Sequence, residues 1–368
     1  MPKYKFGDVV REIKINIDRN NNPYEYYIAG EHMDTNELHL QRRGTFEGSD
    51  VGPAFIRLFK PGQILYGSRR TYLRKVAVAD FEGITSNTTF VLESKDETKL
   101  CQRLLPFIML SDAFTQYSIS KSKGSTNPYI LFSDLSEYEL NLPEIEQQKA
   151  LADVLWALDS TKKAYRNLII STDELVKSQF IEMFKDCPRC RLGDFIQQVR
   201  GVSYKPADLG STADDEHIAL LRANNINNGR INFDDVQYVN RGKVASAQVI
   251  QSKDILVCAS SGSLEHVGKA ALFNDSGEYT FGAFCKLLRP TGVLMPEFIA
   301  AYMAGDEYRR VISDLAQGSN INNLRNEHID ELKIPLPTYE RQLEFISFQQ
   351  QSDKSKFSVQ IAIYRDVW

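Results

Sequence analysis

The feature that most constrains the fold is a motif that occurs twice at a fixed distance along the sequence. Nine positions of one copy match nine positions of the other without a gap, for example 318 − 124 = 194 and 337 − 143 = 194. The first copy contains Gly124, Ser125, Leu135, Glu137, Leu140, Leu142, Pro143, Glu146 and Gln148, and the second contains Gly318, Ser319, Ile329, Glu331, Ile334, Leu336, Pro337, Glu340 and Gln342. Shorter similarities extend the match toward the start of each copy. We therefore interpret the chain as two copies of one unit, residues 1–185 and 186–368.

A long stretch without Gly or Pro, residues 144–185, follows the first motif. Its apolar residues recur at helical spacing, which predicts a helix of roughly 60 Å with a narrow seam for a partner helix. The seam consists of Leu151, Leu155, Leu158, Tyr165, Ile169, Val176 and Met183. Ser171–Glu174 has the S-x-x-E form of a capping box, so the alternative is a helix that stops near Ile170 and restarts. The lack of Gly and Pro favours the unbroken helix.

A second helix is predicted for residues 338–368, after Pro337. Two helices with apolar seams can pack side by side, and the domain between them is large enough for an antiparallel, coiled-coil-like pair. The remaining residues, 1–143 and 186–337, form two similar globular domains. Short apolar segments there predict strands, while 100–119 and 296–315 carry helical spacing. The fold class is therefore α+β, with two similar domains, two long antiparallel helices and a pseudo-two-fold repeat.

Composition limits the kind of protein. The length of 368 residues suits two ordinary domains, and 42% hydrophobic with 25% charged residues is typical of a globular protein. The five cysteines form no disulfide framework, which predicts a reducing cytoplasm, and neither a signal peptide nor a bilayer-spanning run is recognisable. The formal net charge of −4 predicts weak binding to polyanions by the isolated chain.

We find no catalytic constellation in the sequence. Phosphate-binding glycine loops are missing, and so is the N-P-P-[FY] tetrapeptide of adenine methyltransferases. Cys187 and Cys190 form a lone C-x-x-C without a second ligand pair, which only weakly indicates zinc. Asp330–Lys333 imitates the end of a nuclease motif, but the other copy has no Lys there. The chain is thus predicted to be no enzyme, with no metal and no cofactor of its own.

The positive features are basic and polar. Between Asp50 and Asp80 all charged residues are Arg or Lys, and such side chains neutralise phosphates or bind guanine. At matching positions the second copy has Asn and Ser instead, and Asn amides suit adenine, although Asn also favours turns. Different polar residues at matching positions are expected of two domains that recognise two different short DNA sequences. The candidate DNA-binding residues are Arg42, Arg43, Arg69, Arg70, Arg74, Lys75, Lys121, Lys123, Arg222, Asn224, Asn225, Asn227, Ser260 and Ser261.

The repeated motif, GSTNPYILFSDLSEYELNLPEIEQQKAL and GSNINNLRNEHIDELKIPLPTYERQLEF, resembles the conserved-region entry of type I restriction-modification specificity subunits. ILYGSRRTYLRKVAV also resembles the target-recognition core of that family. The resemblance implies that each domain binds one half of a split, asymmetric DNA site while the helices fix the spacing. Two methyltransferase subunits, which bind S-adenosylmethionine, would dock on the helices, and motor-endonuclease subunits would complete the complex. We assign subunit docking to Gly124, Ser125, Gln148, Gly318, Ser319 and Gln342.

Two other classes of function remain open at this stage. The first is a protein-interaction scaffold whose duplicated domains bind protein rather than DNA. The second is a nuclease or methyltransferase with a decayed motif. An electrophoretic shift that depends on Arg69 and Arg70 separates DNA recognition from the scaffold, and activity of the purified chain alone would support an enzyme.

Overall fold

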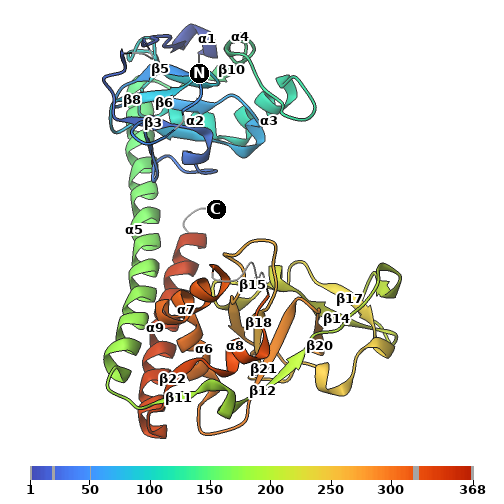
Figure 1. The fold of residues 1–368 in the computed structure, drawn as a ribbon. Coiled ribbons are helices and arrows are strands. Elements are labelled where there is room, and N and C mark those ends of the chain that lie inside the picture. The colour runs from blue at the N-terminus through green and yellow to red at the C-terminus, as the bar shows by residue number, and fades with distance from the viewer. Residues whose placement is uncertain (1, 19–20, 50, 318–322, 366–368) are drawn as a thin grey trace. The chain divides into compact units, whose positions relative to one another are not determined.

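The computed structural model describes residues 2–18, 21–49, 51–317 and 323–365, and it divides into two compact units, 1–162 and 163–368. Each unit has its own hydrophobic cores. The long helix α5 (Ile145–Phe184) contributes its first half to unit 1 and its second half to unit 2 (Figure 1). Within the described residues, no helix is long and apolar enough to cross a membrane.

Helix α5 is continuous over 40 residues, so the prediction of an unbroken helix is confirmed. The predicted capping box does not interrupt it, because Thr172 Oγ1 donates a hydrogen bond to the Leu168 carbonyl one turn earlier, as in a helix interior. The predicted seam is correct only in part. Leu151 and Leu158 are 45% and 44% exposed, whereas Ala152, Phe180 and Phe184 are buried.

Unit 1 contains two four-stranded sheets, in the orders β2-β9-β6-β7 and β4-β3-β8-β5, and a two-stranded ribbon, β1-β10. Its strands are β1 Lys3–Lys5, β2 Val10–Glu12, β3 Tyr26–Ile28, β4 Gly44–Thr45, β5 Phe55–Phe59, β6 Ile64–Gly67, β7 Val76–Val78, β8 Gly83–Ser86, β9 Thr89–Ser94 and β10 Glu139–Asn141. Its helices before α5 are α1 Phe6–Val9, α2 Leu105–Leu110, α3 Asp112–Lys121 and α4 Phe132–Ser136. The ribbon lies at the point where the chain enters α5.

Unit 2 contains sheets β12-β21-β18-β19 and β13-β17-β14-β20, the ribbon β11-β22 that corresponds to β1-β10, and an additional two-stranded sheet, β15-β16. Its strands are β11 Arg189–Arg191, β12 Ile196–Arg200, β13 Leu209–Gly210, β14 His217–Leu221, β15 Ile226–Asn227, β16 Arg230–Ile231, β17 Gln237–Asn240, β18 Ile255–Cys258, β19 Ala270–Leu272, β20 Tyr279–Phe281, β21 Cys285–Pro290 and β22 Lys333–Pro335. Its other helices are α6 Pro296–Ala304, α7 Asp306–Gln317, α8 Asn326–Asp330 and α9 Tyr339–Arg365.

Strand pairing shows that the two units share a common core topology, while the edge strands differ, since β5 pairs with β8 in unit 1 and β13 pairs with β17 in unit 2. The pair β3-β8 is parallel and so is its counterpart β14-β20, while the central pairs β6-β9 and β18-β21 are both antiparallel. Residues 64 and 255, which begin β6 and β18, pair with 92 and 288 in the same way. The duplication deduced from the sequence is therefore a duplication of structure.

The two predicted helices before the repeated motif are each divided in the structure. Ser111 is extended and caps α3 by accepting a hydrogen bond from the Phe114 amide, which separates α3 from α2. Gly305 is likewise extended and separates α6 from α7. The sequence prediction of single helices over 100–119 and 296–315 was wrong at these points, because capping by one polar or flexible residue does not disturb the apolar spacing.

In unit 2, α9 runs antiparallel to the second half of α5 (Figure 1). At one end Phe345 packs on Phe184 with ring centroids 5.7 Å apart. Farther along α9, Lys356 forms an ion pair with Asp173 of α5. Residues 318–322, which include the predicted docking residues Gly318 and Ser319, lie outside the described residues. So does the predicted helix end at Trp368.

Candidate nucleic-acid interface

The loop that follows β6 in unit 1, residues 68–70, is held by the Gly-Ser loop of the repeated motif. We name residues 68–70 the tip loop of unit 1. Arg69 forms an antiparallel bridge with Tyr129, and the Arg70 amide donates to the Pro128 carbonyl at 2.6 Å. Gly124 has φ of +89°, a conformation that favours glycine, and it lets the supporting loop turn back. The Gly-Ser loop therefore supports Arg69 and Arg70.

Unit 2 builds the same arrangement around residues 259–261, which we name the tip loop of unit 2. Ser260 forms an antiparallel bridge with Asn323, 194 residues after Tyr129 (323 − 129 = 194). The Leu324 amide donates to the Ala259 carbonyl at 2.7 Å, as the Ile130 amide donates to Ser68 at 2.9 Å. Ser260 therefore occupies the place of Arg69.

The tip loop of unit 1 carries a basic and aromatic surface. Arg69 and Arg70 are both exposed, and the Nε of Arg70 donates to Asn127 Oδ1 at 3.1 Å. Tyr72 and Tyr129 beside them are 52% and 40% exposed. Exposed Arg next to exposed aromatic rings suits both phosphate contacts and stacking on bases.

Other predicted DNA-binding cations of unit 1 are occupied within the protein. Arg74 donates to Asp112 at 2.6 Å and to the Leu110 carbonyl, Lys75 donates to the Gly30 carbonyl, and Arg42 pairs with Asp34. Lys123 lies 2.9 Å from Asp134 and holds the pKa of that carboxyl below its usual range. Lys121 is exposed, with its ammonium 5.8 Å from the Tyr117 ring centroid. Their DNA contacts remain predictions, and binding to phosphate would have to compete with these partners.

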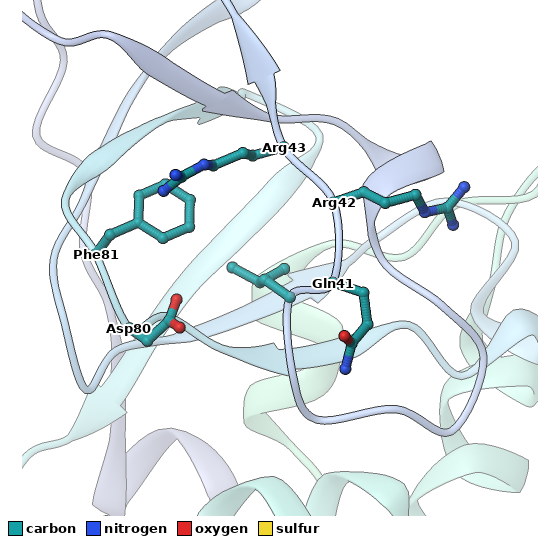
Figure 2. Close-up of a pocket in the computed structure, with 6 residues that line it drawn as sticks. Gln41, Arg42, Arg43, Asp80 and Phe81 are labelled. Atoms are coloured by element: carbon teal, nitrogen blue, oxygen red, sulfur yellow. The ribbon is translucent and has the colours of Figure 1, made fainter. Parts of the chain in front are cut away.

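An open cavity of about 410 Å³ lies between the loop of Arg42 and Arg43 and the segment at Asp80 and Phe81 (Figure 2). The Arg43 guanidinium lies 3.7 Å from the ring centroid of Tyr26 and 5.3 Å from that of Phe81. Figure 2 shows Arg43 extending over Phe81 while Arg42 points away. The stacking fixes the Arg43 side chain but leaves its residue exposed.

The Asn-rich loop of unit 2 is cross-linked by hydrogen bonds. Asp235 accepts from Arg222 at 2.8 Å and from Asn224 at 2.7 Å. Asn225 is 1% exposed, and its amide donates to two carbonyls of the loop. Asn227 is exposed and donates to the Asn224 carbonyl. Asn225 therefore supports the loop, as an Asn in a turn does, and base contacts by the other three remain predictions.

Two of the predicted docking residues are buried. Gln148 and Gln342 are each 1% exposed and hydrogen-bonded within their own unit. They would influence docking through the position of the helix rather than by touching a partner. Gly124 and Ser125 are exposed, while Gly318 and Ser319 lie outside the described residues.

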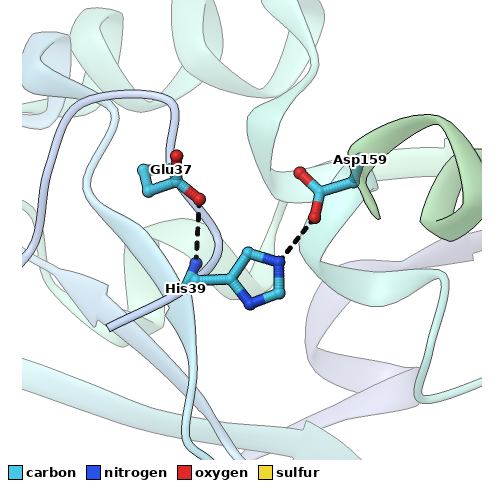
Figure 3. Close-up of side chains that lie close together, drawn as sticks. All are labelled: Glu37, His39 and Asp159. Atoms are coloured by element: carbon cyan, nitrogen blue, oxygen red, sulfur yellow. Dashed lines mark hydrogen bonds and ion pairs between the residues drawn. The ribbon is translucent and has the colours of Figure 1, made fainter. Parts of the chain in front are cut away.

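Sequence spacing did not reveal the cluster of Glu37, His39 and Asp159 in unit 1 (Figure 3). His39 Nε2 lies 2.7 Å from Asp159 Oδ2, and Glu37 accepts from the His39 amide. In a tetrahedral zinc site with ligand atoms about 2.0–2.1 Å from the metal, two ligand atoms lie roughly 3.3 Å apart. The His39 and Asp159 atoms lie closer together than that. The distance fits a hydrogen bond that ties a loop of unit 1 to α5.

Comparison with known proteins identifies the family. Residues 3–170 and 189–362 match the family described as type I restriction modification DNA specificity domain, once for each copy. The chain therefore belongs to this family of type I restriction-modification specificity domains.

Two relatives show how far the similarity extends. The chain is 37% identical over 165 residues to the EcoKI specificity subunit of Escherichia coli K12, covering 43% of this chain and 36% of that protein. It is 38% identical over 144 residues to the StySPI specificity subunit of Salmonella potsdam, covering 39% and 31%. The chain thus matches about a third of the length of these relatives.

Solved structures with the same fold cover almost the whole chain. One belongs to a study of complex assembly and conformational transition of the type I R-M system, with 16% identity, TM-score 0.59, and coverage of 99% of this chain and 94% of that one. The S subunit from M. genitalium has 14% identity, TM-score 0.52 and the same coverage. At such identities the likeness concerns the fold.

Proposed function

We propose that this chain is the DNA sequence-specificity subunit of a type I restriction-modification complex and performs no catalysis itself. Each unit would read one half of a bipartite, asymmetric DNA site. The observation that carries the proposal is the equivalence of the two tip loops, which place Arg69 and Arg70 in one unit where the other has Ser260 and Ser261. One scaffold with different polar groups at the same place is what two readers of different sequences require.

Helices α5 and α9 would connect the readers and bind the partner subunits. Three apolar side chains of α5 in unit 1, Leu151, Val154 and Leu158, are between 44% and 57% exposed and offer an apolar strip. We assign this strip, with the Gly124-Ser125 loop, to contact with two methyltransferase subunits that would hold S-adenosylmethionine. Motor-endonuclease subunits would join the same complex, in the cytoplasm, where free cysteines like the five of this chain stay reduced.

The formal net charge of −4 supports a model in which these partners contribute to DNA binding. Tight DNA binding needs several phosphate contacts, and four of the candidate cations of unit 1 already have acidic or carbonyl partners. The methyltransferase subunits would therefore supply most of the positive field. The specificity subunit would select the site.

Methylome sequencing tests the proposal directly. Cells that express the chain with its methyltransferase subunits should carry methylation at a split motif with two different halves and a fixed gap. Half-sites read from one side of the duplex favour a centre-to-centre spacing of about 10 bp. A contiguous motif or a palindrome would contradict the proposal, and so would methylation that persists when the chain is omitted.

A further inference from the structure

Phe284 of unit 2 is a large apolar side chain that the protein leaves in water. It is 70% exposed, the highest value among the large hydrophobic side chains described as exposed. It lies in the turn Gly282–Cys285 between β20 and β21. Among the described residues, its ring does not stack on another aromatic ring. An isolated exposed Phe is unremarkable by itself, so its backbone setting decides what it can do.

The backbone holds Phe284 rigidly against the tip loop of unit 2. Its carbonyl accepts hydrogen bonds from the amides of Ala259 at 2.9 Å and Ser260 at 3.0 Å. The Cys285 amide closes the turn on the Gly282 carbonyl at 2.9 Å. A Cβ on Gly201 would lie 2.1 Å from the Gly282 carbonyl oxygen, so a close backbone approach also fixes the turn. The ring therefore projects from a defined point next to Ser260.

The equivalent point in unit 1 lies beside Arg69. There the Ser68 amide donates to the Thr88 carbonyl at 3.1 Å, as Ala259 does to Phe284. Thr88 is half-buried, and its hydroxyl pairs with Ser86 Oγ at 2.7 Å. Unit 1 thus presents exposed arginines at this place, whereas unit 2 presents an apolar ring beside neutral serines. If unit 1 turns this surface to DNA, the shared topology turns the surface of Phe284 to DNA as well.

We propose that Phe284 contacts the C5 methyl group of a thymine in the half-site read by unit 2. This inference rests on the proposed function and names one base for one side chain. The thymine methyl is the apolar group that the major groove displays, and it suits a Phe that has no hydrogen bond to offer. Hydroxyls of Ser260 and Ser261 alongside can donate to or accept from the neighbouring base edges.

The test uses the complete complex of this chain with its methyltransferase subunits and the site found by methylome sequencing. Each thymine of the half-site read by unit 2 is replaced singly by deoxyuridine, which lacks only the methyl group. Binding is measured by fluorescence anisotropy. We expect one position at which the wild-type complex loses about fivefold to tenfold in affinity, the size of one lost base contact.

Variants of Phe284 complete the test. Phe284→Ala should lose the same factor on thymine DNA and no longer distinguish thymine from uracil at that position, while Phe284→Leu should keep part of the difference. Val293→Ala is the matched control, because Val293 is also exposed, at 63%, but follows the opposite end of β21. All three variants should retain the wild-type unfolding temperature and recognition of the half-site read by unit 1.

The outcomes separate this inference from the proposed function. A motif that is not bipartite contradicts the proposed function and the inference together. A bipartite motif whose second half lacks thymine, or whose thymines all tolerate uracil, contradicts the inference alone. Equal losses by Phe284→Ala on thymine and uracil DNA, or loss of methyltransferase subunits from the complex, would show that the ring contacts something other than the methyl group.

Discussion

Gln148 and Gln342 lie 194 residues apart (342 − 148 = 194) and make the same three hydrogen bonds. The Gln148 side chain accepts from the Cys101 amide and donates to the carbonyls of Lys99 and Pro143. In unit 2 the corresponding partners are the Met295 amide and the carbonyls of Val293 and Pro337. Each buried amide thereby joins the first turn of a long helix to its globular domain and pairs three main-chain groups.

Replacing either Gln by Ala should destabilise the unit that contains it. The buried partners would lose their hydrogen bonds, which costs about 1–3 kcal/mol of unfolding free energy per variant. Urea unfolding of Gln148→Ala and Gln342→Ala measures the effect. Gln147→Ala is the matched control, because Gln147 is exposed on the same helix turn. A Gln148→Ala curve that overlays the control would show that the three bonds contribute nothing.

Replacing Arg69 and Arg70 by Ala should weaken DNA binding by the assembled complex and reduce its dependence on salt. If each arginine neutralises one phosphate, the slope of log K against log salt falls by about 2. Affinity is measured between low and moderate salt on the same duplex. Ser260→Ala with Ser261→Ala serves for comparison and should leave the slope unchanged, since no charge is removed. An unaltered slope after the double arginine substitution would place the DNA elsewhere on unit 1.

Asp254→Ala should destabilise unit 2 much more than Gln63→Ala destabilises unit 1. The two residues precede the equivalent strands β18 and β6. Asp254 is 2% exposed and pairs with Arg289 at 2.7 Å, so its removal leaves a largely buried guanidinium without its carboxylate partner and costs about 3–5 kcal/mol. Gln63 is only half-buried and donates an amide hydrogen bond to the Glu93 carboxylate at 2.9 Å, and its loss costs about 1.5 kcal/mol. Chemical denaturation of the two variants gives both values, and similar losses would contradict the argument.

Cys258 and Cys285 should resist alkylation in the native protein. They pair across β18 and β21, and burial raises the pKa of both thiols, so little thiolate is present at pH 8. Cys187 and Cys190 are only half-buried, and because burial raises the pKa of the Cys190 thiol, Cys187 should be labelled first. Differential alkylation followed by mass spectrometry measures the order, with the unfolded chain as the control in which all five react. Rapid native labelling of Cys285 would mean that the central strands of unit 2 open readily.

Much of the architecture could be predicted from the sequence because it depends on repetition and period. The constant offset of 194 residues predicted equivalent positions such as Tyr129 and Asn323, which form equivalent bridges. The run without Gly or Pro predicted α5, whereas the local S-x-x-E signal at Ser171 proved weaker than the continuous helical pattern around it. Helical spacing can be predicted because it is local, and the repeat can be predicted because two copies of a similar sequence adopt similar folds.

The hydrogen-bond and ion-pair partners of individual polar side chains were not predictable, because those partners are distant in sequence. Arg74 meets Asp112, and Arg222 and Asn224 meet Asp235, through loops whose course the sequence does not reveal. His39 and Asp159 come together across 120 positions and without any recognisable spacing. Phe284 was missed for a different reason, since a Phe before a strand looks like a core residue until the turn around it is known.

The difference between the two tip loops also affects how each unit would first encounter DNA. Arginine charges attract a phosphate backbone over about 8 Å at physiological salt, whereas serine hydroxyls and a phenyl ring act only on contact. On the proposed function, unit 1 would therefore attract passing duplex before either half-site is read. Unit 2 would contribute only after contact, so that the first encounter with DNA would depend mainly on one of the two readers.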